Sequence, residues 1–190
     1  YGFMLNDQAG ILDDLIVYRL DKENWMIVVN AATTAGDFTQ IKENLSVKSS
    51  LENVSAKMAK LDLQGPQSCE VLKEIFGPSV QKLNYYTFAE FKIFNHQSCI
   101  ISRTGYTGEL GYEIYIADNY AVEMWELLLK DDRVRPAGLG CRDTLRLEMG
   151  YPLYGQDLDM AHTPLSAGFS KFVDLTKDFI GKDALLKEQR

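Results

Sequence analysis

The sequence contains little of what disulfide scaffolds, metal centres and membrane spans are made from. Its three cysteines lie far apart and form no CxxC pair, so neither a disulfide framework nor a structural zinc site is expected. The protein is therefore expected in a reducing compartment. Only two histidines are present, which argues against a metal centre for catalysis. The longest apolar runs, such as residues 25–29, fall far short of the ~20 residues that a membrane helix needs.

Basic residues are also scarce. Twenty Lys and Arg stand against 27 Asp and Glu, so the net charge is −7 and the basic footprint of a nucleic-acid-binding protein is missing. With 46% hydrophobic and 25% charged residues, the composition is that of a globular protein and excludes intrinsic disorder. A length of 190 residues allows one large domain or two small ones.

Both ends of the sequence are abrupt. It begins at Tyr1 rather than at Met, runs at once into a strand-like apolar stretch, and ends at Arg190 within a helical pattern. We therefore expect a piece of a longer protein, in which no targeting segment is visible.

Hydrophobic periodicity predicts strands and helices in mixed order, which is typical of the α+β class. A β-hairpin is expected from residues 15–18 and 25–29, with further strands at 59–63, 87–94, 98–103 and 112–116. A loop at 31–37 should lead into a short helix that begins near Phe38. Three more helices are expected: one capped by Ser68, one capped by Asp118 or Asn119, and one from about Cys141 to Met149.

Two adjacent carboxylates, Asp13 and Asp14, interrupt the apolar stretch 10–18. A charge that enters a core costs several kcal/mol unless it has a partner, so the pair is unusual. Because successive side chains of a strand face opposite ways, only one of the two can point into a given cavity. Solvated acids at the start of a strand are the alternative interpretation from spacing alone.

Three other stretches combine glycines with polar or aromatic residues. Residues 103–113 suit either a loop that brings its backbone close to a ligand or a plain hairpin loop. At 136–143, glycines before a helix leave N–H groups for an anion beside Arg142, although a solvated Arg142 is the simpler interpretation. The Tyr- and Gly-rich stretch 150–157 is more simply the cover of a core edge.

Common catalytic motifs are missing. There is no G-x-S-x-G and no P-loop, and Asp143 stands where a G-x-G-x-x-G would need its third glycine. Cys69 and Cys99 fit buried small hydrophobes. Cys141 lies at a predicted helix start, but no histidine near it in the sequence offers itself as a base.

Six stretches occur in a fixed order between residues 10 and 159: GILDDLIVY, VVNAAT, LQGP, RTGYTGELGYE, PAGLGCRDTLRLE and YGQDLD. Together they closely resemble the aminomethyltransferase (T-protein) family of the glycine cleavage system, over essentially the whole chain. The family protein is longer, so the resemblance implies that an N-terminal segment and a C-terminal β-barrel domain are missing. It also implies two α+β lobes around a central folate cavity, with residues 1–50 and 155–190 in the first lobe and 51–154 in the second.

The resemblance implies an enzyme that uses tetrahydrofolate as co-substrate. Its partner would be the lipoylated H-protein, from whose aminomethyl group ammonia is released while the one-carbon unit forms 5,10-methylenetetrahydrofolate. Asp14 matches the family's catalytic Asp, so Asp13 would face away. Glu113 matches the family's pterin-binding Glu, since a carboxylate accepts an N–H and an amino group side by side.

Other positions match further folate contacts of the family. Val28 and Asn30 match contacts made through backbone or amide groups, and Arg142 matches an Arg that serves the glutamate tail or the lipoyl arm. Flat rings that sandwich the folate are implied at four positions: Tyr1, Tyr18, Tyr85 and Tyr151. No metal, nucleic acid or membrane is expected as a partner.

Other folate-binding proteins on the same scaffold remain as alternatives. These are the tetrahydrofolate-binding domain of sarcosine or dimethylglycine dehydrogenases, a demethylase, and a non-catalytic protein of iron–sulfur cluster assembly. The sequence departs from the family at Cys141, where Ala is usual, and at Lys171, where Trp is common. The resemblance implies a cytoplasmic protein, or one of the mitochondrial matrix if the source is a eukaryote.

Overall fold

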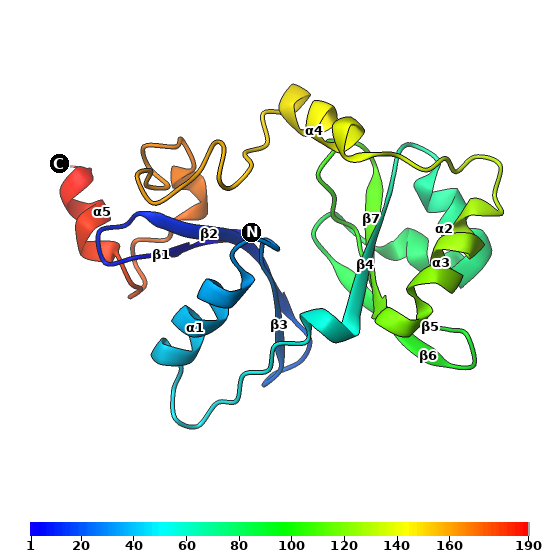
Figure 1. Cartoon of the computed structure of the whole chain (residues 1–190), viewed down its shortest axis with the longest axis horizontal. Coiled ribbons are helices and arrows are strands. Elements are labelled where there is room, and N and C mark those ends of the chain that lie inside the picture. Colours follow the sequence, from blue (N-terminus) through cyan, green and yellow to red (C-terminus); the bar gives the residue numbers. More distant parts are fainter. Residues whose placement is uncertain (190) are drawn as a thin grey trace. The chain divides into compact units, whose positions relative to one another are not determined.

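The computed structural model describes residues 1–189, which divide into two compact units (Figure 1). The first unit contains Tyr1–Leu51 and the described residues from Pro152 onward, and the second contains Glu52–Tyr151. Each unit combines an antiparallel sheet with helices in mixed order along the chain, so the expected α+β class is confirmed.

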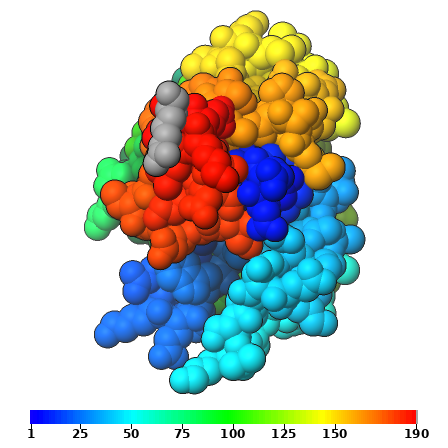
Figure 2. Space-filling model, turned by 90° about the vertical axis from the view of Figure 1, so that its left-hand side faces the viewer, coloured from blue at the N-terminus to red at the C-terminus, as the bar shows by residue number. Residues whose placement is uncertain are grey.

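The first unit is built on a three-stranded antiparallel sheet in the order β1-β2-β3. Its elements are β1 (Gly2–Leu5), β2 (Ile11–Arg19), β3 (Trp25–Val28), α1 (Thr34–Asn44), a short 3-10 helix (Ser170–Phe172) and α5 (Lys182–Glu188). Its core joins the beginning of the chain to its later part, because Leu5 and Ile11 pack with Leu158 and Leu185. Figure 2 shows the N-terminal residues in dark blue beside the late residues in orange and red.

The second unit is built on a four-stranded antiparallel sheet in the order β4-β7-β6-β5. Its strands are β4 (Met58–Gln64), β5 (Phe88–Ile93), β6 (Gln97–Ser102) and β7 (Gly111–Ala117). Its α-helices are α2 (Ser68–Phe76), α3 (Ala121–Leu129) and α4 (Leu139–Glu148), with short 3-10 helices at Ser55–Lys57, Pro78–Lys82 and Asp118–Tyr120.

Strand β7 divides the second unit into an apolar and a polar side. Gly111–Ile116 are all buried, yet alternate side chains point to opposite faces. Ile114 and Ile116 face a core that Leu72 of α2 and Met124 of α3 complete. Glu113 directly precedes Ile114 in the strand and therefore faces the other side of the sheet, where polar side chains gather.

The sequence predicted most elements, with three errors at helix starts. The 15–18 and 25–29 hairpin is present as β2 and β3, but α1 begins at Thr34, inside the expected loop. Ser68 does not cap α2, because it is already helical and its hydroxyl donates to the carbonyl of Leu110 at 3.1 Å. Asp118 and Asn119 do not cap α3, because they form the 3-10 turn that precedes it.

Within residues 1–189, no helix has both the length and the apolar character to cross a membrane. The three cysteines form no disulfide. Cys99 is buried on β6, and burial raises the pKa of its thiol to about 11, which fits a small core residue.

A matched pair of valines tests the core of the second unit. Val71 is 2% exposed on α2 and Val122 is 69% exposed on α3. Val71→Ala should lower the free energy of unfolding by about 2 kcal/mol more than Val122→Ala, since only Val71 leaves a cavity. The gain in helix propensity is common to both variants and cancels. Urea unfolding measures the difference, and equal values for the two variants would contradict the packing described.

Candidate functional site

Asp14 lies on β2, the middle strand of the first unit's sheet. Ile16, two residues further along, pairs with Val28 of β3. Asn30 follows shortly after β3, and its side-chain amide reaches back to β2. The alternation of the strand buries Asp13 fully and leaves Asp14 partly exposed.

Two neutral donors hold the Asp14 carboxylate. Tyr1 donates its hydroxyl to Oδ2 at 2.9 Å, and Asn30 donates Nδ2 to Oδ1 at 3.0 Å. Burial raises the pKa of Asp14 and the charge of Asp13 adds to the rise, while the hydrogen bonds from Tyr1 and Asn30 oppose it. The net result is an oriented carboxylate with a pKa above its ordinary value.

Asn30 also binds the other acid of the pair. Its backbone N–H donates to Asp13 Oδ2 at 2.9 Å, and its Nδ2 donates to Asp13 Oδ1 at 2.8 Å. Asp13 therefore anchors Asn30, and Asn30 in turn orients Asp14.

Asp37, near the start of α1, is a third acid of the first unit that the sequence did not bring to attention. It is 3% exposed, and its Oδ2 has no hydrogen-bond partner among the described residues. Burial raises the pKa of Asp37 to about 6; a hydrogen bond from Thr33 lowers it, and the neighbouring Asp13 raises it. Asp37 therefore keeps its proton to a higher pH than an exposed carboxyl group does.

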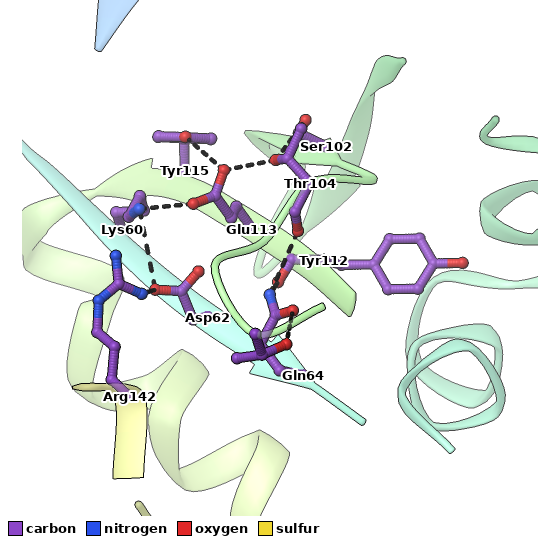
Figure 3. Close-up of polar contacts among 10 residues, drawn as sticks. Lys60, Asp62, Gln64, Ser102, Thr104, Tyr112, Glu113, Tyr115 and Arg142 are labelled. Atoms are coloured by element: carbon purple, nitrogen blue, oxygen red, sulfur yellow. Dashed lines mark hydrogen bonds and ion pairs between the residues drawn. The ribbon is translucent and has the colours of Figure 1, made fainter. Parts of the chain in front are cut away.

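In the second unit, the polar face of the sheet is centred on Glu113 of β7 (Figure 3). Its Oε1 accepts from Lys60 Nζ at 2.6 Å, and its Oε2 accepts from the hydroxyls of Thr104 at 2.5 Å and Tyr115 at 3.1 Å. Burial acts to raise the pKa of Glu113, but the charge and hydrogen bond of Lys60, with the two hydroxyl donors, hold that pKa below its ordinary value. Glu113 is thus a buried acceptor that stays ionised.

Lys60 connects Glu113 to a row of alternating charges that ends at Arg142 on α4. Its Nζ lies 3.8 Å from Asp62 Oδ2, and Arg142 Nη1 lies 3.2 Å from the same oxygen. The Arg142 guanidinium also lies 4.7 Å from the centroid of the Tyr106 ring, which stacks on Tyr151 at 5.8 Å. Arg142 is therefore held by an ion pair and an aromatic face.

Gln64, the last residue of β4, holds the glycine loop 105–111. Its amide bonds to three groups: the carbonyls of Thr104 (3.2 Å) and Tyr112 (3.3 Å) and the hydroxyl of Thr107 (3.2 Å). A Cβ atom at Gly105 or Gly111 would overlap the Gln64 amide. These two glycines are required because they leave room for the side chain that fixes the loop.

Two cavities of the second unit adjoin these residues. A cavity of about 770 Å³ follows β4 and is lined in part by Lys60, Asp62 and Arg142. A smaller one of about 240 Å³ lies beside the glycine loop, with Tyr85 and Tyr151 in its wall. Burial raises the pKa of both tyrosines, so both remain neutral donors near pH 7.

The predicted site residues fall into two groups, one in each unit. In the first unit, Tyr1, Asp14 and Asn30 are in direct contact, Val28 lies on the adjacent strand, and Tyr18 is buried at 3% exposure. In the second unit, Tyr85 and Tyr151 line one cavity, and Lys60 and Asp62 connect Glu113 to Arg142.

The sequence did not point to Lys60 and Asp62. The signal that was available is their spacing, because Lys60, Asp62 and Gln64 recur every second residue along a strand whose other members are apolar. Among residues 1–189, no group of three or more His, Cys, Asp and Glu is arranged to hold a metal ion.

Residues 1–177 match the family model of the GCVT N-terminal domain. The chain belongs to this family. An aminomethyltransferase from Thermoanaerobacter sp. (strain X514) is 44% identical over 194 residues, covering 100% of this chain and 53% of the relative. One from Desulfitobacterium hafniense (strain Y51) is 45% identical over 190 residues, covering 97% of this chain and 52% of the relative.

A solved structure agrees with the fold of this GCVT chain. The glycine cleavage system aminomethyltransferase T from Bartonella henselae superposes with a TM-score of 0.87 at 35% identity, over 98% of this chain and 51% of that chain. The expected family membership is therefore confirmed, and the chain spans about half the length of the relatives it matches.

A pair of glycine variants tests the Gln64 contact of the GCVT chain. Gly111→Ala should lower the free energy of unfolding by about 1 to 3 kcal/mol, because the added methyl overlaps the Gln64 amide. Gly138→Ala is the control, since a Cβ there meets nothing within 4 Å. Equal stabilities in urea unfolding would contradict the contact.

Asp37→Asn tests the buried acid of α1. A raised pKa in the folded state means that folding takes up a proton, so Asp37 makes the free energy of unfolding fall as pH rises from 3.8 to about 6. An Asn side chain does not titrate, so the variant lacks this fall in the free energy of unfolding. Its stability relative to wild type should rise by about 1 to 3 kcal/mol across that window.

Urea unfolding at pH 4, 5, 6 and 7 measures this relative stability. Asp7→Asn, an exposed acid of the same unit, is the control and should keep the pH dependence of wild type. A wild-type slope in Asp37→Asn would show that Asp37 ionises normally.

Proposed function

We propose that the complete protein carrying this chain is a tetrahydrofolate-dependent aminomethyltransferase of the glycine cleavage system. It releases ammonia from the aminomethyl group presented by a lipoylated H-protein and forms 5,10-methylenetetrahydrofolate. The observation that carries the proposal is membership of the GCVT N-terminal domain family across residues 1–177.

Asp14 is the carboxylate we assign to the reaction. Its raised pKa makes it a better proton acceptor than a solvated Asp, and its charge favours a cation that develops beside it. Tyr1 and Asn30 each donate to one of its oxygens, so its orientation is set before a ligand arrives. Asp13 is fully buried and serves this arrangement by holding Asn30.

Glu113 is the acceptor we assign to the folate ring. Bound tetrahydrofolate supplies the nitrogen that takes up the one-carbon unit, and its pterin ring carries an N–H beside an amino group. An ionised carboxylate fits such a pair of donors, and Glu113 is kept ionised by Lys60. This chemistry of the acceptor supports the assignment.

The remaining residues have binding roles in the proposal. Val28 and Asn30 contact folate through backbone or amide groups, and Arg142 serves its glutamate tail or the lipoyl arm of the H-protein. Aromatic rings flank the ligand at four positions: Tyr1, Tyr18, Tyr85 and Tyr151.

Asp14→Asn in the complete protein tests the proposed reaction. The variant should lower the rate of tetrahydrofolate-dependent ammonia release from aminomethyl-lipoyl H-protein by about 100-fold or more, since Asn neither takes up a proton nor carries charge. Asp7→Asn, an exposed acid of the same unit, should leave the rate unchanged.

The wild-type protein provides the reference for this assay, with and without tetrahydrofolate. Ammonia release that does not depend on folate would overturn the proposed function. A folate-dependent rate that Asp14→Asn leaves intact would overturn only the role of Asp14.

A further inference from the structure

Glu113 poses a physical problem for which the second unit contains a specific solution. Its side chain is 5% exposed, and an ionised carboxylate so deeply buried is costly unless a counter-charge and donors surround it. Two hydroxyl groups, those of Thr104 and Tyr115, satisfy Oε2. The counter-charge comes from Lys60, which contacts Oε1 at 2.6 Å.

The sheet register explains how Lys60 reaches this position. Strands β4 and β7 pair with Lys60 opposite Tyr115 and Asp62 opposite Glu113. Lys60 is therefore the diagonal neighbour of Glu113 on the same face, within the reach of a long side chain. Its side chain remains 32% exposed, so the ammonium group keeps part of its hydration while it serves a buried partner.

Asp62 keeps the polar face electrically balanced. It lies between two cations, with Lys60 Nζ at 3.8 Å and Arg142 Nη1 at 3.2 Å from its Oδ2. The row Glu113–Lys60–Asp62–Arg142 thus contains two negative and two positive side chains in alternation (Figure 3). Lys60 is the one member that contacts both carboxylates, so its removal leaves two acids beside one another.

We propose that Lys60 is a positioning residue for folate binding, which fixes the Glu113 carboxylate as the acceptor for two adjacent ring N–H donors. This inference rests on the proposed function. Lys60 acts through Glu113 and has no catalytic part of its own.

Protonation of Glu113 is the expected consequence of losing Lys60. Burial is the largest influence on the pKa of Glu113 and acts upward, and the charge of Lys60 is the largest influence that opposes it. The titratable groups facing Glu113 include Lys60 and Asp62 on β4 and Tyr115 on its own strand, while Arg142 on α4 faces Asp62. Without Lys60, only the hydrogen bonds from Thr104 and Tyr115 oppose burial, so the pKa of Glu113 should rise. A protonated Glu113 would present a donor where the ring N–H needs an acceptor.

The test compares four forms of the complete protein that carries this chain: wild type, Lys60→Met, Lys60→Arg and Lys57→Met. Lys57 is the matched control because it also pairs with a glutamate, Glu52 at 2.8 Å, but is 73% exposed. The probe is 5-formyltetrahydrofolate, a reduced folate that resists oxidation, and calorimetric titration from pH 5.5 to 9 gives its dissociation constant.

Lys60→Met should bind the probe about tenfold or more weakly than wild type at pH 7, with the loss shrinking as pH rises and Glu113 ionises. Lys60→Arg should retain most of the affinity, and Lys57→Met all of it. Loss of affinity by the same factor at every pH would indicate a merely structural role and overturn the proposal. Unchanged affinity in Lys60→Met would overturn it as well.

A second measurement reads Glu113 directly and keeps the two proposals apart. Carbon NMR of glutamate labelled at Cδ, with Glu113→Gln for assignment, should show a higher titration midpoint for Glu113 in Lys60→Met than in wild type. An unmoved midpoint overturns the role of Lys60 even if the protein binds folate. Failure of wild type to bind the probe at any pH would instead overturn the proposed function.

Discussion

The polar chemistry of both units depends on one constraint: an interior strand points alternate side chains to opposite faces of its sheet. In β7 this rule sends Ile114 and Ile116 into the core and Glu113 to the other face, although all three are buried. A carboxylate can occupy the middle of a sheet only because donors surround it: Lys60 on β4, Tyr115 on β7 itself and Thr104 just beyond β6. The arrangement of Lys60, Thr104 and Tyr115 follows from that need.

The first unit meets the same constraint by a different device. Asp13 and Asp14 are adjacent on an interior strand, so alternation alone would separate their surroundings completely. Asn30 stands just beyond the adjacent strand and donates to both carboxylates through one amide. A neutral donor suits this position, because a cation would lower the pKa of Asp14, which burial raises. The first unit therefore holds Asp14 with neutral amide and hydroxyl donors alone, whereas the second unit adds the ammonium group of Lys60 to the two hydroxyl donors of Glu113.

Local patterns in the sequence predicted the strands well because alternation and turn residues are local properties. The hairpin of β2 and β3 and the strands of the second unit could be recognised from a few consecutive residues. The role of Lys60 could not be recognised in this way, because it depends on the pairing of β4 with β7. Lys60 and Glu113 are 53 residues apart in the sequence. The burial of Asp37 could not be predicted for a similar reason, because it is decided by tertiary contacts and no side-chain cap marks the start of α1.

The order of the two units along the chain has a consequence for synthesis on the ribosome. The second unit is one continuous segment, Glu52–Tyr151, whereas the core of the first unit needs Leu5 and Ile11 from the beginning of the chain and Leu158 and Leu185 from its later part. As the chain emerges, the second unit is complete while strands β1 to β3 still lack the part of their core that the later residues supply. The carboxylate pair of the first unit is thus assembled after the second unit, on strands whose apolar face stays exposed while more than a hundred residues are added.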